Sequence, residues 1–138
     1  MPDLNVNYLA VAVAALATFL IGALWYSPLV FGKQWMQANG YTPEKLQAMQ
    51  ANATRAYIVS FVCYLVVAYV LAVLVHHVEV ASVMGGVRLG ALVWIGFAAT
   101  IGLTGNLFSD KPLMAYVLDA GYQLVYLVVM GAIIGWWS

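Results

Sequence analysis

The chain has 138 residues, of which 65% are hydrophobic and 7% are charged, and its formal net charge is zero. Soluble domains contain about 45–50% apolar and about 25% charged residues, so this excess of apolar side chains requires a lipid environment. A neutral chain lacks the electrostatic footprint of a nucleic-acid-binding protein, and the single cysteine, Cys63, excludes an internal disulfide. Composition predicts one domain, residues 1–138, embedded in a membrane.

Four apolar segments follow in chain order, each close to the roughly 20 residues that an α-helix needs to cross a bilayer. We expect membrane helices at about residues 5–26, 56–76, 86–108 and 113–137. Apolar runs of this length are helical in lipid, because their backbone amides and carbonyls find no water partner there. The predicted fold is all-α, an integral membrane four-helix bundle.

The connection between the first two predicted helices, about residues 27–55, is long enough to contain structure of its own. Its stretch 29–39 combines aromatic and basic side chains and predicts a short helix lying in the membrane interface. Thr42 followed by Pro43 and Glu44 is a strong helix start signal. We therefore expect short interfacial helices here and a possible extension of the second membrane helix back to residue 43.

Basic residues near the helix ends predict the orientation, since cytoplasmic connections carry the excess of Lys and Arg. Arg88 is the one basic residue on the side of the second connection, and the other four flank the first and third connections. This distribution predicts a cytoplasmic first connection and both termini outside the cytoplasm. The residues expected to anchor helix ends in the headgroup region are Trp25, Tyr26, Trp35, Trp136 and Trp137.

Small residues at every fourth position allow helices to approach closely within lipid, where the hydrophobic effect does not drive their association. Such stripes occur on the first, third and fourth predicted helices. Their members are Ala10, Ala14, Thr18, Gly22, Gly86, Gly90, Ala98, Gly102, Gly131 and Gly135. Three stripes of this kind predict a tight bundle that also associates with copies of itself.

Asp119 lies about two turns into the fourth predicted helix. A carboxylate near the middle of a membrane helix costs about 2.5–3.5 kcal/mol on insertion scales, so such residues face a partner or a cavity. The expected threading brings polar residues of three helices to one depth: Asp119, Gln123, Tyr122, Tyr126, Thr100, Thr104, Ser60 and Tyr64. Two interpretations follow, a proton-titrating or ligand-binding site and a hydrogen-bonded staple that fixes helix register.

The rest of the sequence offers little support for a metal site or a catalytic site. His76 and His77 lie near Glu79, but adjacent residues of a helix point to different faces, which argues against a metal site. The sequence shows no Ser-His-Asp arrangement, no paired acid–base carboxylates and no Gly-rich phosphate-binding loop. We therefore expect no metal, no cofactor and no enzyme activity.

Several short motifs of the chain also occur in known protein sequences. They are Asn7-Tyr8-Leu9, Gly22-Ala23-Leu24-Trp25-Tyr26-Ser27-Pro28, Phe31-Gly32-Lys33, Trp35-Met36, Gly90, Trp94-Ile95-Gly96-Phe97, Phe108, Lys111-Pro112, Gly121-Tyr122-Gln123, Met130-Gly131 and Gly135-Trp136. With them the chain resembles an uncharacterised family of small bacterial membrane proteins, domain of unknown function 1761. The resemblance implies a four-helix protein of the bacterial inner membrane and supplies no activity. The resemblance implies that Asn as well as Asp often occupies position 119, so that a negative charge is not required there, which favours the staple.

Two functions from different classes follow from these observations. The first is a structural or partner-binding bundle that is homo-oligomeric, with the lipid bilayer and its own copies as partners. The alternative is a small channel or transporter that uses the polar cluster around Asp119. The sequence names no protein partner and no solute.

Overall fold

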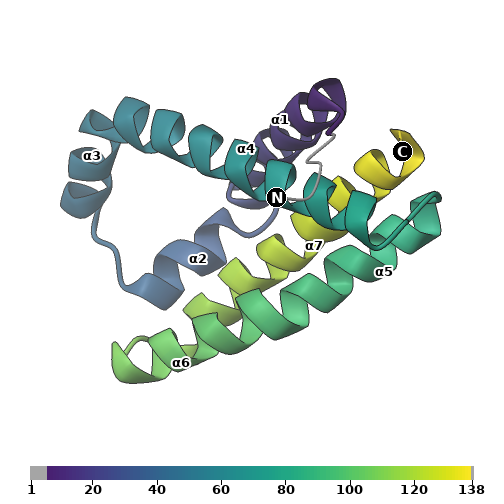
Figure 1. The fold of residues 1–138 in the computed structure, drawn as a ribbon. Coiled ribbons are helices and arrows are strands. Elements are labelled where there is room, and N and C mark those ends of the chain that lie inside the picture. Colours follow the sequence, from purple (N-terminus) through teal and green to yellow (C-terminus); the bar gives the residue numbers. More distant parts are fainter. Residues whose placement is uncertain (1–5, 138) are drawn as a thin grey trace.

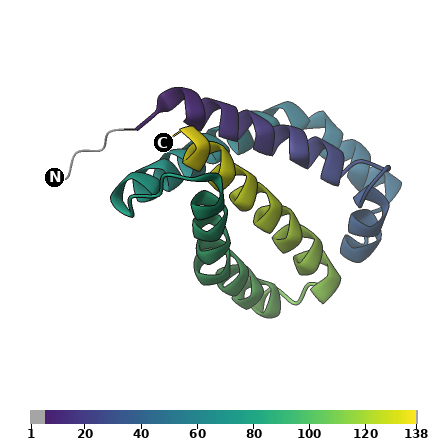
Figure 2. The same ribbon diagram turned by 90° about the vertical axis from the view of Figure 1, so that its right-hand side faces the viewer.

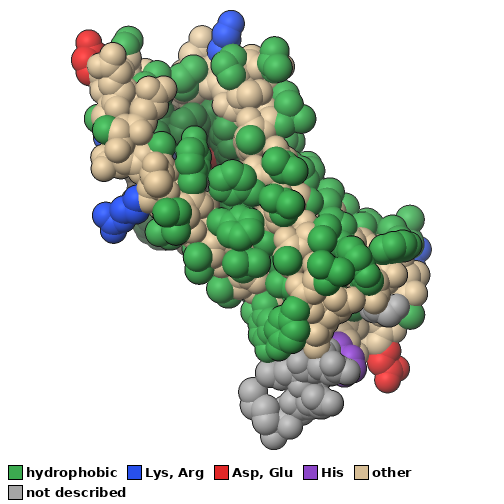
Figure 3. All heavy atoms as spheres, turned by 90° about the horizontal axis from the view of Figure 1, so that it is seen from above, with side chains coloured by type: hydrophobic (Ala, Val, Ile, Leu, Met, Phe, Trp, Pro, Cys, Tyr) green, Lys and Arg blue, Asp and Glu red, His purple; other side chains and the backbone are tan. Residues whose placement is uncertain are grey.

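The computed structural model describes residues 6–137, and within this range the chain forms helices and no strand. Four helices are long and apolar enough to cross a membrane: Tyr8–Trp25, Ala53–His77, Val83–Phe108 and Leu113–Trp137. Hydrophobic side chains cover the middle of the face seen in Figure 3, and the charged side chains lie toward its two ends. The chain is thus an all-α integral membrane protein, as the sequence predicts.

Eight helical segments follow one another along the described part of the chain (Figure 1). They are α1 (Tyr8–Trp25), α2 (Gly32–Asn39), α3 (Pro43–Ala51), α4 (Ala53–His77), α5 (Val83–Val93), the π-helix η1 (Trp94–Ala99), α6 (Thr100–Phe108) and α7 (Leu113–Trp137). The third span consists of α5, η1 and α6 in continuous succession. The short helices α2 and α3 lie between the first two spans.

The second span does not extend back to residue 43 as one helix. The Thr42 side chain accepts a hydrogen bond from the amide of Lys45 and caps α3, as the start signal predicts. Asn52 then leaves the helical conformation, with φ −108° and ψ 11°. Its side-chain amide donates to the carbonyl oxygen of Ala48 at 3.3 Å. Asn side chains compete in this way with the helical ladder, and α3 and α4 are therefore separate helices.

The fourth span, α7, is the central helix of the fold. The third span runs beside it as an antiparallel hairpin, while α1 and α4 pack on it from the other side (Figures 1 and 2). Figure 2 also shows that the beginning of α1 and the end of α7 lie at the same end of the molecule. Because α7 contacts every other span, its side chains determine how the bundle is held together.

Glycines make the contact between α5 and α7 unusually close. A Cβ atom on Gly86 would collide with the carbonyl oxygen of Gly131, and a Cβ atom on Gly131 would collide with that of Gly86. Gly90 and Gly135 also meet backbone carbonyls across this contact. Side chains at these positions would force the two helices apart. The small residues that the sequence places on these helices therefore lie in a helix–helix contact.

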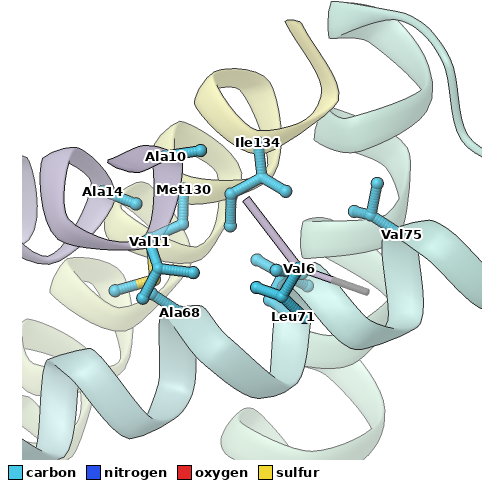
Figure 4. Close-up of a cluster of buried hydrophobic side chains, with 10 residues drawn as sticks. Val6, Ala10, Val11, Ala14, Ala68, Leu71, Val75, Met130 and Ile134 are labelled. Carbon is cyan, nitrogen blue, oxygen red and sulfur yellow. The ribbon is translucent and has the colours of Figure 1, made fainter. Parts of the chain in front are cut away.

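The first span packs through its predicted small residues. Ala10, Ala14 and Thr18 are completely buried. Figure 4 shows Ala10 and Ala14 beside Met130 of α7 and near Ala68 of α4, in the apolar core that these three spans share. Further along the same face, a Cβ atom on Gly22 would lie 2.6 Å from the hydroxyl oxygen of a tyrosine on α7. This face of α1 is thus occupied along its whole length.

The small stripe of the third span does not continue as the sequence suggests. Gly86 and Gly90 are buried, but at the next levels Ala98 is only half-buried and Gly102 is exposed beside the ring of Tyr116. The buried residue there is Ala99. The π-helix η1 is the reason, because its wider turn contains one extra residue and shifts the inward face by one position. The rule that every fourth residue of this span faces inward therefore fails after residue 93.

Candidate functional site

Asp119 accepts a hydrogen bond from Tyr26, a residue that the sequence predicts for the membrane interface and not for the polar cluster. The hydroxyl group of Tyr26 donates a 2.6 Å hydrogen bond to Oδ1 of Asp119. The indole Nε1 of the neighbouring Trp25 donates to the carbonyl oxygen of Leu118 at 3.1 Å. Trp25 and Tyr26 were expected to anchor the helix end in the headgroups. Both are half-buried, and both attach the end of α1 to α7.

A tight turn after α1 aims these two side chains at α7. The amide of Gly32 donates to the carbonyl of Ser27 at 2.9 Å, and the amide of Phe31 donates to that of Trp25 at 3.0 Å. A Cβ atom on Gly32 would lie 2.6 Å from the carbonyl oxygen of Tyr26, so the turn closes only around a glycine. The rings of Phe31 and Trp25 pack with their centroids 4.6 Å apart. The Trp-Tyr-Ser-Pro and Phe-Gly motifs of the sequence thus form the turn that directs Trp25 and Tyr26 toward α7.

Tyr122 links three spans from one turn further along α7. Its hydroxyl group donates to the carbonyl oxygen of Thr18 on α1 at 2.9 Å, and its oxygen lies 3.0 Å from the hydroxyl of Tyr64 on α4. The carbonyl can only accept, so the single Tyr122 proton is directed at Thr18 and the Tyr64 hydroxyl donates to Tyr122. The rings of Tyr26 and Tyr126 lie 5.4 and 4.9 Å from the Tyr122 ring. We call Tyr26, Tyr64, Tyr122 and Tyr126 the tyrosine cluster.

Four residues predicted for the site do not join this network. Thr100 donates to the carbonyl of Gly96, and Thr104 donates to the carbonyl of Thr100, each at 3.0 Å, and both threonines are exposed. The side chains of Ser60 and Gln123 are half-buried and form no hydrogen bond with any residue in the described range. The network therefore joins α7 to α1 and to α4. No residue of the third span takes part in it within the described part of the chain.

The third span is attached to α7 by two hydrogen bonds of its own. Trp94 donates through Nε1 to the carbonyl oxygen of Ala120 at 2.9 Å, and the hydroxyl of Tyr116 donates to the carbonyl oxygen of Ala99 at 2.6 Å. Sequence reasoning missed Tyr116 and Trp94 as structural donors. Trp94 could have been identified from its position in the middle of a span, because its indole N–H needs a partner in lipid. Tyr116 lies in the first turn of α7, where an aromatic residue gives no such signal.

Of the remaining predicted anchors, Trp35 borders this site, whereas Trp136, Trp137 and the histidine pair lie outside it. Trp35 packs edge-on against Tyr26, Trp136 is 67% exposed, and Trp137 is half-buried. His76 and Trp137 line a cavity of about 580 Å³ at the opposite end of the bundle. Among residues 6–137 no three His, Cys, Asp or Glu side chains lie close enough together to hold a metal ion.

The hydrogen-bonding state of the site limits its chemistry. Every buried side-chain nitrogen or oxygen in the described part of the chain has a hydrogen-bond partner. Asp119 is half-buried and has one donor, Tyr26, and no cation among the described residues. The arrangement offers hydroxyl groups that hold helices together, and one carboxylate whose second oxygen is not hydrogen-bonded within residues 6–137.

The family model described as "Protein of unknown function (DUF1761)" matches residues 9–135, which is almost the whole chain. No curated protein and no solved structure matches the chain.

Proposed function

Because the chain belongs to the DUF1761 family, whose description assigns no activity, we propose its function from its surface and its site. It is a non-catalytic membrane bundle that binds a protein partner within the bilayer, and this partner is a second copy of the same chain. The network around Asp119 stabilises each copy from within. The third span provides the contact between copies.

The observation that carries this proposal is the exposed outer side of the third span. Only 11% of the residues in an apolar 18-residue stretch of this span are buried within one copy, against 39% for the fourth span. Gly96, Thr100 and Thr104 are all exposed and stand four residues apart. The two threonine hydroxyls bond back to their own helix, so they share one side with Gly96. We call these three residues the outer stripe.

Small residues at this spacing allow a second helix to approach closely in lipid. A Cβ atom on Gly96 would meet nothing within 4 Å, so this position is unoccupied by the chain's own side chains. The same kind of spacing forms the contact between Gly86 and Gly131 inside one copy. A second copy that packs on the outer stripe would repeat a contact that the fold already uses.

One observation favours transport as a second candidate function. The Asp119 carboxylate lies within a span, is not fully buried, and uses only Oδ1 in a hydrogen bond to a described residue. A proton or a cationic solute could bind at the other oxygen. Under this hypothesis Asp119→Asn abolishes pH-dependent flux into liposomes. Under the proposal of a structural bundle, the wild-type protein carries no such flux.

The proposal includes a location. We place the protein in a bacterial inner membrane, with the connection between α1 and α4 in the cytoplasm and both termini outside. The distribution of basic residues supports this orientation: Lys33, Lys45, Arg55 and Lys111 belong to one side. Alkaline phosphatase fused to the C-terminus would be active in this orientation, and inactive in the opposite one.

Self-association is tested by native mass spectrometry of the protein released from lipid nanodiscs. We expect dimers for the wild type and a loss of about tenfold in dimer affinity for Gly96→Leu, which corresponds to about 1.4 kcal/mol. Gly105→Leu is the matched control, because Gly105 lies on the same span with open space around it but outside the outer stripe. A monomeric wild type, or equal effects of the two variants, would contradict the proposal.

A further inference from the structure

A second hollow lies between the two short helices α2 and α3, outside the Asp119 site. It has a volume of about 320 Å³ and is lined by residues of both helices and of the turn between them: Lys33, Met36, Gln37, Gly40, Tyr41, Pro43 and Leu46. We call it the α2–α3 groove. Gly40 makes the turn possible, since its φ of +68° lies in the left-handed region.

The polar groups of the α2–α3 groove suit an anion. Lys33 is exposed and has no acidic partner among the described residues. The hydroxyl of Tyr41 and the side-chain amide of Gln37 are likewise not hydrogen-bonded within residues 6–137. None of the described residues that line the groove is acidic, and the neighbouring Glu44 is not among them. One cation and two uncharged donors thus surround a space with no negative side chain.

The remaining lining of the groove is apolar. Met36 and Leu46 are half-buried on the facing sides of the two helices. The ring of Tyr41 packs edge-on against Trp35 with a centroid distance of 5.1 Å. Trp35 packs in turn against Tyr26, which binds Asp119. The groove is therefore tied to the bundle rather than carried by a free loop.

We propose that the α2–α3 groove binds the phosphate group of an anionic phospholipid. The Lys33 ammonium pairs with the phosphate, the Tyr41 hydroxyl and the Gln37 amide donate to its oxygens, and the apolar lining receives the adjoining glycerol and acyl carbons. Charge complementarity selects an anionic headgroup, and the position of the groove in the connection between two membrane spans selects a lipid. The proposal is independent of self-association through the outer stripe.

The test uses the full chain in nanodiscs of phosphatidylglycerol mixed with phosphatidylcholine, with retained lipids counted by native mass spectrometry. We expect retention of phosphatidylglycerol by the wild type. Lys33→Gln should reduce it about fivefold, the loss for about one surface charge. Tyr41→Phe should reduce it in the same direction. Lys45→Gln is the matched control, because Lys45 lies on α3 outside the groove, and it should leave retention unchanged.

Three outcomes would overturn the proposal. Equal retention of phosphatidylcholine would remove the role of charge. Equal losses in Lys33→Gln and Lys45→Gln would indicate general surface charge rather than a site. Binding of inorganic phosphate in pure phosphatidylcholine nanodiscs, with the same dependence on Lys33, would identify a free anion as the ligand. Tyr41→Phe keeps the ring contact with Trp35, so it tests the groove even where the lysine variant is poorly folded.

Discussion

The Tyr26 hydroxyl donates a 2.6 Å hydrogen bond to the Asp119 carboxylate and joins the end of the first span to the fourth across 93 residues of sequence. Trp25 adds a second hydrogen bond to α7 one residue earlier. Two neighbouring side chains thus fix where the first span ends relative to α7. This attachment explains how a carboxylate is accommodated within a span without a cation among the described residues.

We expect Asp119→Asn to be nearly neutral for stability and Asp119→Leu to be destabilising. The Asn carbonyl oxygen still accepts from Tyr26, whereas Leu removes the acceptor. Interhelical hydrogen bonds in membranes contribute on average about 0.6 kcal/mol and at most about 1.7 kcal/mol, so the loss should fall in this range. Unfolding in mixed micelles measures it, and a double-mutant cycle with Tyr26→Phe isolates the pair. A loss of stability in Asp119→Asn as large as in Asp119→Leu would show that the charge itself is required.

Tyr122→Phe should destabilise the bundle more than Tyr64→Phe. The Tyr122 hydroxyl has both a carbonyl acceptor and a tyrosine donor, and its removal leaves both without it. The Tyr64 hydroxyl takes part in one of these contacts. We expect a difference of about 0.5–1 kcal/mol, comparable with one net hydrogen bond. The same micelle unfolding assay measures it, and equal losses would contradict the assigned direction of the Tyr122 proton.

Gly86→Ala and Gly131→Ala should each separate α5 from α7. The added Cβ meets the backbone of the partner helix rather than a movable side chain. Overpacking typically costs about 1–3 kcal/mol, and a contact with backbone should reach the upper part of this range. Thermal unfolding in detergent measures the loss. Gly105→Ala is the control, because its Cβ has open space, and an equal loss there would point to a general effect of glycine replacement.

These contacts show what the sequence could predict. The spacing of Gly86 and Gly90 and of Gly131 and Gly135 indicated a helix contact that the structure contains, because close approach in lipid requires small residues. The same spacing at Ala98 and Gly102 indicated a buried contact that the structure does not contain. Thr100 was expected beside Asp119 only because both residues were predicted to lie at the same depth in the membrane. Depth does not determine which side of a helix faces its neighbour, and the structure turns Thr100 outward.

The same limit applies at the ends of the helices. The sequence placed Tyr26 correctly at a helix end, but an aromatic residue there can face either headgroups or protein. The turn around Gly32 decides between them, and it depends on hydrogen bonds that composition does not reveal. The π-helix likewise has no signal in a spacing rule, and it is the reason why Ala99 rather than Ala98 is buried.

Removing the extra residue of the π-helix should be tolerated. Phe97 is 72% exposed within η1, and its deletion lets this segment close as an ordinary α-helix without rotating the residues on either side. Deleting the exposed Leu92 from α5 instead would rotate the residues that follow it directly by about 100° and displace Trp94 from Ala120. We expect the first deletion to retain most of the thermal stability and the second to lose it. Comparable stability of the two deletion variants would contradict this account of η1.

The most direct test of self-association is cysteine crosslinking through the outer stripe in native-like membranes. The background is Cys63→Ala, because Cys63 is exposed and would react itself. Oxidation of Thr100→Cys should give a covalent dimer, while Gly105→Cys on the same span should give little. A monomer in both cases, or equal dimer in both, would contradict the proposal that two copies meet at the outer stripe.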